Sequence, residues 1–597
     1  MRFDFGAIVK RWVVANADRL RENHRRMIRL NRTVTLLDAK AEVDGGVRSV
    51  DDRLARRAAI AELKELESVE HFDLGKYRVL YIPKKGFRIT RAKRQRGRNS
   101  VEFFDAMPFY ATGLEEAAGL DRMAKKYLGP DAHKTAEAEG LDVAALGSED
   151  GYYEAHRDAI VRYCRRDCEL TAALFSLTLA SFERIGYPFP KQPWSRASVG
   201  RELLKRSGVL ETTRKAYARL SERGDSRLWE NAYAGACILM RGVGAWPDVS
   251  KWDINSAYPA AMVAFPSLEG AYLVKPDDPR FDRCFFRFYE VDLIPTPRRA
   301  LPERGGDRGH LVYVDGGTKA RRACVTHLDL EAFDEAGDRY TIVDAVGVFT
   351  PSAERPLSFM AELYNRKTAV GKQYGKESAE YLNAKIPLNG VYGILAQSRP
   401  REGRYTNFIY AAYITAFCRR ELWHKAKELE AQGGTVIAYM TDGLFVSGLP
   451  SLPEPSKALG AWDVEFEGLA VLFANGIYYV PKTATPTWDG LKKRGAPDLD
   501  VKALMNAAHP WVTTHRSRPL GLKAGIIRGK PEAIGCFLDE RKDLCPARML
   551  EDAGLRMVPD LRSAPLSDFF SRSWLLDYRA PTEAHLPARR LVLSVDA

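Results

Sequence analysis

The spacing of apolar positions changes several times along the chain, and each change marks a predicted element. Residues 1 to about 70 place an apolar residue every three or four positions among many charged ones, as in DDRLARRAAIAELKELESV at 51–69. This spacing predicts a charged helical region over 1–75, whose role the pattern does not indicate. The runs YRVLYIP and SVEFFDAMPFY then predict two strands on either side of the basic tract RAKRQRGR. This tract is either the solvated tip of a hairpin or a binding segment, and the sequence favours neither interpretation.

Long helices and short strands alternate over the rest of the chain. The predicted elements are helices at 112–129, 155–182, 356–374, 377–395 and 411–432, a strand, turn and helix at 251–262, β-type sequence at 263–350 and a hairpin at 435–448. Pro188, Pro190 and Pro193 place a domain boundary near residue 190. The last hundred or so residues show no clear period. The pattern predicts a multidomain protein of the α+β or α/β class.

Composition and charge limit the class of binding partner and the cellular compartment that we expect. The 597 residues, 45% of them hydrophobic, suffice for several cores and about three or four domains. The net charge of +13 favours a polyanionic partner such as nucleic acid, although membrane-surface and ribosomal proteins are also basic. The eight cysteines form no C-x-x-C pair, which predicts reduced thiols in the cytoplasm without zinc or disulfides. We expect no signal peptide and no membrane span, because no run approaches ~20 apolar residues.

Three short motifs carry candidate chemistry. Asp253 ends a strand in WDINSAYPAAM, and Asp442 occupies the turn of the hairpin AYMTDGLFV. Each is weak alone, because an Asp that caps a turn and a D-G hairpin turn are ordinary. Between them, Lys385, Asn389 and Tyr392 share one helix face at i, i+4 and i+7. A cation, an amide and an aromatic ring suit a triphosphate, a sugar and a base, although a surface helix can show the same residues by accident.

The order of the three motifs is more specific than any one of them. A strand-end Asp with S-x-Y-P, then K-x-x-x-N-x-x-Y-G, then a T-D hairpin resembles the polymerase motifs of the family B DNA polymerases. YAGA at 233–236 is similar to the family element that couples the polymerase and exonuclease regions. TAFCR at 415–419 is similar to the T-x-x-G-R element, and YYVPK with LKKRG to the primer-strand K-x-Y element and its basic sequel. The resemblance spans about 76–500.

The resemblance implies a right-hand polymerase with palm, fingers and thumb, preceded by an exonuclease-type domain of RNase H-like fold. The implied division is a helical N-terminal region at 1–75, the exonuclease-like domain at 76–190, palm at 191–262 and 406–480, a palm insertion in the position of the terminal-protein region at 263–350, fingers at 351–405, and thumb with the C-terminal region at 481–597.

The resemblance also assigns roles to single residues. Two Mg²⁺ ions, for which Mn²⁺ is a substitute, would be held by Asp253, Asp442 and the carbonyl of Ile254. Arg366 and Lys385 would bind the triphosphate, Tyr258 would exclude a 2′-hydroxyl, and Asn389 and Tyr392 would line the nascent base pair. The implied DNA contacts are Tyr233, Gly235, Thr415, Arg419, Tyr478 and Lys492. The implied partners are primer–template DNA and deoxynucleotides, with a terminal protein as a candidate primer, and we expect a monomer.

Several positions depart from the family pattern. Met440 replaces the first Asp of D-T-D, Gly476 stands at the K-x-Y lysine, and Cys418 replaces a small residue of T-x-x-G-R. Gly390 stands where Ser is common, and Pro387 falls inside a predicted helix, where it removes a hydrogen bond at a cost of ~3 kcal/mol. We expect Met440 to change metal affinity and fidelity more than to abolish reaction.

The exonuclease-like region lacks part of its carboxylate set. Tyr163 and Asp167 in YCRRD match its third motif, but Asp4 lacks the partner Glu and Asp73 lacks the preceding Asn. Because four carboxylates hold the two metals of such a nuclease, we expect a degenerate exonuclease. The long interval from Asp253 to Lys385, together with FFDAM, most resembles the protein-primed branch, whereas the short interval from 393 to 415 leaves little room for its second insertion.

Three hypotheses follow. The first is an active DNA polymerase of a phage, plasmid or mobile-element type. The second is a non-catalytic nucleic-acid-binding protein derived from a polymerase, motivated by Met440, Gly476 and the missing exonuclease carboxylates. The third, a stand-alone nuclease that uses Asp167, lacks partner carboxylates.

Overall fold

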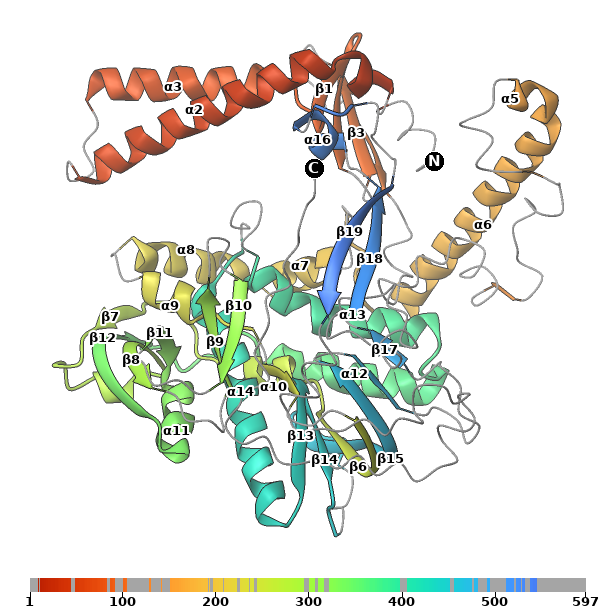
Figure 1. Cartoon of the computed structure of the whole chain (residues 1–597). Helices are drawn as coiled ribbons and strands as arrows, with labels where there is room; N and C mark the ends of the chain where they lie inside the picture. The colour runs from red at the N-terminus through yellow and green to blue at the C-terminus, as the bar shows by residue number, and fades with distance from the viewer. Residues whose placement is uncertain are drawn as a thin grey trace.

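The computed structural model describes most of the chain between residues 9 and 544 (Figure 1). The described residues lie in the ranges 9–43, 49–82, 86–91, 100–104, 151–191, 197–235, 237–294, 300–305, 310–315, 321–397, 405–450, 456–474, 477–480, 491–493, 512–519, 522–531 and 537–544, less short gaps at 10, 208, 223–225, 241–243 and 528, together with the single residues 128, 129, 141 and 193. Most of the helix predicted at 112–129, as well as Asp4 and Gly476, therefore lies outside the described residues.

A seven-stranded antiparallel sheet, called the central sheet below, has the strand order β17-β16-β15-β6-β14-β13-β5. Its strands are β5 (Cys237–Met240), β6 (Gly244–Ile254), β13 (Thr435–Thr441), β14 (Gly443–Ser447), β15 (Trp462–Ala474), β16 (Ile477–Tyr479) and β17 (Leu491–Lys493). Figure 1 shows β13, β14, β6 and β15 in the lower part of the view, below α12 (Phe359–Tyr374) and α13 (Ala379–Leu395). The strand, turn and helix predicted at 251–262 are confirmed as β6 followed by α10 (Ala257–Val263), and the hairpin predicted at 435–448 is confirmed as β13 and β14.

Alternation along the strands gives this sheet two different faces. Trp252 and Leu444 pack with Leu422 and Leu429 of α14 (Phe408–Ala431), so the helix covers one face. Val249, Met440, Phe445, Ala470 and Tyr478 form a separate apolar cluster. Because successive strand residues point to opposite faces, Asp253 lies on the face opposite Trp252, with Val249.

The helical pair predicted at 356–374 and 377–395 is confirmed as α12 (Phe359–Tyr374) and α13 (Ala379–Leu395). The Ser378 side chain caps α13 by accepting a hydrogen bond from the Tyr381 N–H at 3.1 Å. Helix α13 continues through Pro387, whose ring is buried. The large core around this helix offsets the lost hydrogen bond, because Ile386, Leu388, Val391 and other apolar side chains of α13 pack into it.

The β-type sequence predicted at 263–350 is confirmed as an antiparallel sheet, β11-β8-β12-β7, with a separate hairpin of β9 and β10. Its elements are β7 (Tyr272–Val274), the 3-10 helix η3 (Phe281–Arg283), β8 (Phe286–Ile294), β9 (Ala300–Gly305), β10 (His310–Asp315), β11 (Arg321–Thr326), α11 (His327–Ala336) and β12 (Arg339–Phe349). Helix α11 is not part of the sequence prediction. It begins in a capping box, in which the Asp329 carboxylate accepts a hydrogen bond from the Thr326 N–H at 3.1 Å.

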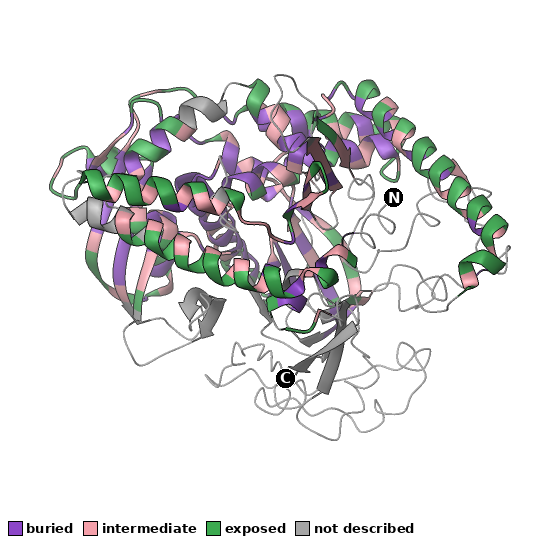
Figure 2. Cartoon of the chain, turned by 90° about the horizontal axis from the view of Figure 1, so that it is seen from above, coloured by how far each residue is buried: buried purple, intermediate pink, exposed green. Residues whose placement is uncertain are grey.

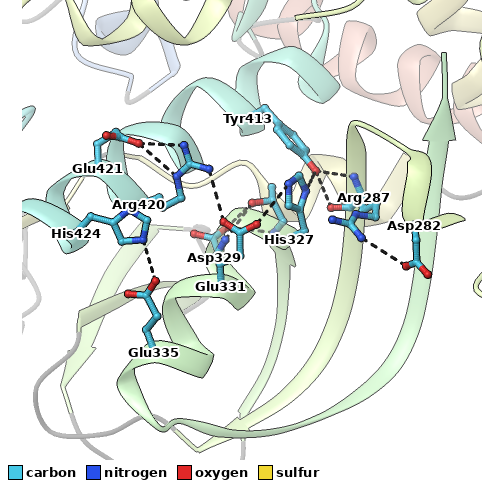
Figure 3. A network of polar contacts seen from close by, with 11 residues as sticks. Asp282, Arg287, His327, Asp329, Glu331, Glu335, Tyr413, Arg420, Glu421 and His424 are labelled. Carbon is cyan, nitrogen blue, oxygen red and sulfur yellow. Dashed lines mark hydrogen bonds and ion pairs between the residues drawn. The ribbon is translucent and has the colours of Figure 1, made fainter. Parts of the chain in front are cut away.

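Helix α11 docks on α14 through the polar network shown in Figure 3. Arg420 of α14 lies 3.5 Å from Glu331, and His424 lies 3.1 Å from Glu335. Nδ1 of His327 lies 2.6 Å from the hydroxyl of Tyr413, which is fully buried. Burial and the nearby cation of Arg287 lower the pKa of His327 to about 4, so this junction contains a neutral imidazole near pH 7.

The N-terminal region predicted to be helical is confirmed as an antiparallel pair of helices, α2 and α3. Beyond it the structure has four antiparallel strands where two are predicted, and the first begins a few residues before the boundary predicted at 75. The elements are α2 (Ala17–Val43), α3 (Val50–Glu65), β1 (His71–Leu74), β2 (Tyr77–Ile82), β3 (Gly86–Arg91), β4 (Ser100–Phe104), α5 (Tyr152–Ala155), α6 (Arg157–Arg184), α7 (Ala197–Arg206), α8 (Val209–Ser221) and α9 (Ser226–Ala232).

The C-terminal region contributes a hairpin, β18 (Val512–Pro519) and β19 (Phe537–Leu544), and the short helix α16 (Leu522–Ile527). Within the described residues, no helix combines the length and the apolar character needed to span a bilayer.

Candidate active site

The central sheet brings Asp253 and Asp442 side by side. Asp253 on β6 pairs with Gly443 on β14, and the Ile254 N–H donates a hydrogen bond to the Asp442 carbonyl at 3.0 Å. Two residues 189 positions apart therefore end at the same point of the sheet, as the order of the motifs predicts. Their placement is fixed by strand pairing, which is the most rigid way to hold two carboxylates next to each other.

Gly443 makes this approach possible. A Cβ atom at residue 443 would lie 2.4 Å from the Trp252 carbonyl oxygen and 3.1 Å from Oδ1 of Asp253. Both distances are shorter than ordinary van der Waals contact, and the closer atom belongs to the backbone. The glycine of T-D-G is therefore required here by the close approach of β14 to β6.

Backbone strain is concentrated at the same place. Ser256 and Thr441 are the only non-glycine residues with positive φ in the described part of the chain, at 54° and 70°. Ser256 follows Asp253 by three positions, and Thr441 directly precedes Asp442. A β-branched threonine rarely adopts this conformation, and strain of this kind gathers at functional sites.

The electrostatics of the site are incomplete without a cation. Burial raises the pKa of Asp253 to about 8, and the negative charges of Asp442 and Glu465 add to the effect. The cations of Lys251 and Lys385 act in the opposite direction but do not cancel it. A carboxylate whose charge is this unfavourable near neutral pH is suited to bind a divalent ion with hard oxygen ligands.

The neighbouring carboxylates each contact a lysine, although Oδ1 of Asp463 is buried and has no hydrogen-bond partner among the described residues. Glu465 forms an ion pair with Lys251, and Asp463, which lies opposite Asp253 on β15, forms one with Lys457. In the part of the chain that the structure describes, no cluster of three or more His, Cys, Asp or Glu side chains is arranged to hold a metal. The expected ligand set of Asp253, Asp442 and the Ile254 carbonyl therefore stays a prediction, and the structure places its two aspartates next to each other.

The structure shows why the hairpin offers Asp442 alone. Met440 is only 3% exposed and packs with Val249, Phe445 and Tyr478. A carboxylate at residue 440 would be buried among apolar side chains, which carries a large free-energy penalty. The missing first Asp of the family motif is therefore replaced by a core residue.

The predicted face of α13 is present. Lys385 and Asn389 are exposed, Tyr392 is half-buried, and the residues between them are mostly buried. Lys385 is close enough to Asp253 to lower its pKa, so this face lies toward the carboxylates.

Arg366 and its neighbour Lys367 point to different places. The Arg366 guanidinium donates hydrogen bonds to the carbonyls of Ile185 and Gly186 at 3.4 Å and lies over the ring of Tyr187. Lys367 lies 3.5 Å from the Ser256 hydroxyl, and burial and the cation of Lys385 lower its pKa to about 8. The structure thus places Lys367, which sequence reasoning missed, beside the candidate site.

Three tyrosines form one aromatic cluster next to the carboxylates. The rings of Tyr258 and Tyr392 lie 4.4 Å apart, and the hydroxyls of Tyr233 and Tyr392 are 2.8 Å apart. Burial raises the pKa of both Tyr258 and Tyr392, so both phenols keep their protons near pH 7. The YAGA element therefore contacts α13 through Tyr233.

Arg419 lies inside the protein. Its guanidinium is only 8% exposed, and it donates hydrogen bonds to both carboxylate oxygens of Asp329 at 2.9 and 3.0 Å. It also donates to the carbonyls of Ala234 and Gly235 at 3.0 and 3.1 Å. Arg419 thus fixes the YAGA loop and links it to the 263–350 region, and a direct DNA contact by Arg419 stays a prediction.

The remaining predicted residues lie apart from the carboxylates. The buried Thr415 hydroxyl bonds within α14, and Tyr478 is buried against Phe445. Lys492 is exposed on β17, directly opposite Tyr478. Tyr163 and Asp167 are one turn apart in the N-terminal half of α6, which Figure 1 shows leading away from the central sheet.

Comparisons with known proteins agree on the fold. No protein-family model matches the sequence. A DNA polymerase of the Acidianus bottle-shaped virus (isolate Italy/Pozzuoli) is 23% identical over 264 residues, 41% of this chain and 37% of the viral protein, so the match spans about a third of that protein's length.

Two structures of phi29 DNA polymerase are similar to most of the chain. The ternary complex with primer–template DNA and incoming nucleotides has a TM-score of 0.51 at 14% identity, over 77% of this chain and 83% of phi29 polymerase. The post-translocation complex with primer–template DNA has a TM-score of 0.52 at 15% identity, over 76% and 82%. The chain has the mixed α/β, multidomain fold of the family B DNA polymerases. Within that class its fold is related to that of the protein-primed phi29 enzyme, so the resemblance seen in the motifs is confirmed.

Proposed function

We propose that this protein is a DNA-dependent DNA polymerase that adds deoxynucleotides to a 3′-hydroxyl. The observation that carries the proposal is that Asp253 and Asp442 lie next to each other where β6 pairs with β14, because Asp253 pairs with Gly443 and the Ile254 N–H bonds to the Asp442 carbonyl. Burial and the charge of Asp442 make the negative charge of Asp253 unfavourable there, and a bound cation would compensate for it. The phi29 structures of the same fold contain primer–template DNA and incoming nucleotides, which supports these as the partners.

The residues of the site have separate roles in this proposal. Asp253, Asp442 and the Ile254 carbonyl would hold two Mg²⁺ ions, or Mn²⁺ in their place, which activate the 3′-hydroxyl and neutralise the triphosphate. Lys385, together with Lys367, binds the phosphates and stabilises charge on the leaving pyrophosphate. Arg366 would do so only after leaving the carbonyls of Ile185 and Gly186.

The aromatic cluster would select and position the nucleotide. Tyr258 lies under the sugar, where its ring leaves no room for a 2′-hydroxyl. Its contacts with Tyr392, and the hydrogen bond between the hydroxyls of Tyr392 and Tyr233, hold the ring in place. Asn389 and Tyr392 line the nascent base pair from α13. A protonated Tyr258 keeps negative charge away from the triphosphate, which agrees with its raised pKa.

We assign the central sheet from β5 to β16, with α10 and α14, to the palm, and α12 and α13 to the fingers. The region after 481 is then the thumb, whose strand β17 pairs with β16 at the edge of the palm sheet. The 263–350 sheet is then the palm insertion, which Arg419 joins to the palm through Asp329. The 76–190 region, with Tyr163 and Asp167 on α6, would be a degenerate exonuclease of RNase H-like fold. Priming by a terminal protein, the monomeric state and a cytoplasmic location belong to the same proposal.

Template-dependent incorporation tests the function. The pure protein, given a primed template, Mg²⁺ or Mn²⁺ and one labelled deoxynucleotide, should extend the primer only when that nucleotide is complementary to the template. Incubation on unprimed template shows in the same series whether priming needs an added primer. Salt-dependent DNA binding without incorporation in either metal would instead support a binding protein derived from a polymerase.

A further inference from the structure

The pair of helices α2 and α3 forms an arm that contacts the rest of the described chain only at its base (Figure 1). The base is a small core in which Leu20 packs with Phe72, Val79 and Ile526. Beyond Leu20 no described side chain of α2 is buried, and on α3 only Ala59 is, as the green and pink ribbons of Figure 2 show. The arm therefore contributes little to the core and presents long faces to solvent.

One face of α2 is strongly basic. Residues 19–32 contain six arginines and one acidic residue, Glu22. Arg25, Arg29 and Arg32 follow one another at i, i+4 and i+7, so they share a helix face. The side chains of Arg25 and Arg29 are 64% and 68% exposed, and both lie against the single carboxylate of Glu22, at 3.6 and 3.1 Å. One counter-charge leaves this face with a surplus of positive charge.

The other side chains on this face limit what it can bind. Ile28 and Leu36 lie on the same face and are 56% and 61% exposed. Helix α2 has no Phe, Tyr or Trp, so it lacks the platform on which unpaired bases stack. Arginine forks match phosphate oxygens in pairs, so the arginines of this face suit a phosphate backbone.

We infer that this face of α2, defined by Arg25, Arg29 and Arg32, binds the sugar–phosphate backbone of DNA without reading its sequence. Arg25 and Arg32 are separated by ~10 Å along the helix axis, a length that covers about three successive phosphates of one strand. The choice of DNA as the polyanion rests on the proposed function. The arm then adds a contact to the nucleic acid outside the site at Asp253 and Asp442.

The test compares two double variants of the same arm. Arg25→Gln/Arg29→Gln removes two charges from the proposed face, and glutamine keeps the helix propensity. Arg53→Gln/Arg57→Gln removes two exposed arginines from α3, which has four basic and four acidic residues. Urea unfolding compares the folding of both variants with that of the wild type.

The readout is the salt dependence of binding to labelled duplex and single-stranded DNA, followed by fluorescence anisotropy. The Arg25/Arg29 variant should lose roughly 1.8 from the slope of log K against log salt on duplex, or roughly 1.4 on a single strand, while the Arg53/Arg57 variant keeps the wild-type slope. A loss that reaches the expected value on one type of DNA only identifies the form that the arm binds, and losses of roughly 1.8 and 1.4 on the two types show that it binds both.

Two outcomes separate this inference from the proposed function. If the wild-type protein extends primers and the Arg25/Arg29 variant keeps the wild-type slope on both DNAs, the inference is overturned and the proposed function stands. If the slope falls as expected but the wild-type protein incorporates no nucleotide, the arm is supported and the proposed function is contradicted.

Discussion

Replacing Gly443 by alanine should separate the two carboxylates without removing either. The new Cβ would start 2.4 Å from the Trp252 carbonyl oxygen, and ordinary contact begins at 3.4 Å, so β14 must move about 1 Å away from β6. A displacement of about 1 Å in a catalytic group can reduce the rate by about 100-fold. We therefore expect kcat for single-nucleotide incorporation to fall about 100-fold in Gly443→Ala, with a loss of about 1–3 kcal/mol in the free energy of unfolding.

Gly434→Ala is the matched control for this loss of stability. Its Cβ would meet Leu449 and Val446 at 2.8 Å and the Leu429 carbonyl at 3.0 Å, at the opposite end of the same hairpin from Asp442. This variant should lose comparable stability but keep kcat at temperatures at which it is folded. Rapid-quench incorporation and urea unfolding measure the two quantities. A Gly443→Ala protein as fast as the wild type would refute the idea that this contact sets the distance between the carboxylates.

Three further predictions follow from the charges in and around the site. Lys367→Gln should raise KM for the nucleotide about tenfold or more. Because the pKa of Lys367 is lowered to about 8, kcat/KM of the wild-type protein should fall above pH 8, and Lys367→Arg should flatten that fall. A wild-type kcat/KM that does not change with pH would contradict this role of Lys367. Asp329→Ala leaves Arg419 buried without its carboxylate and should lower the free energy of unfolding in urea by about 3–5 kcal/mol, and a loss below about 1 kcal/mol would disagree with a buried pair. The fold raises the pKa of Asp253 from 3.8 to about 8, so the charge of Asp253 destabilises the metal-free protein increasingly as pH rises from about 4 to about 8. In chelator at pH 9, Asp253→Asn should therefore be more stable to unfolding than the wild-type protein, by no more than about 5 kcal/mol. Equal stabilities of the two proteins at pH 9 would argue against the raised pKa.

The sequence indicates the two carboxylates because the patterns of the elements that hold them are clear. The alternation around Asp253 predicts a strand, and the T-D-G turn predicts a hairpin with Asp442 at its tip. That the two aspartates lie together is implied only by the family resemblance of the ordered motifs. The close approach at Gly443 could not be predicted, because it depends on the spacing of two strands that are far apart in the chain.

The choice between Arg366 and Lys367 shows a second limit of the sequence. Adjacent helix residues point about 100° apart, and which of them faces the site depends on how α12 docks. Arg419 is similar, because its partner Asp329 is 90 positions away and pattern alone does not pair them. The start of helix α11 could have been predicted from the sequence, because T-x-x-D before its apolar positions is a capping signal. Strand β3 was not predicted, because it runs directly into the basic tract and has no clear boundary in the sequence pattern.

The central claim is that Asp442 is the carboxylate its hairpin contributes and that no neighbour replaces it. The most direct test is single-nucleotide incorporation in Mg²⁺ by Asp442→Asn, compared with Asp248→Asn, which removes a carboxylate from the same sheet where it accepts a hydrogen bond from Ser447. We predict that Asp442→Asn loses incorporation in Mg²⁺ and in Mn²⁺ while Asp248→Asn extends primers like the wild type. Full activity in Asp442→Asn would contradict the account.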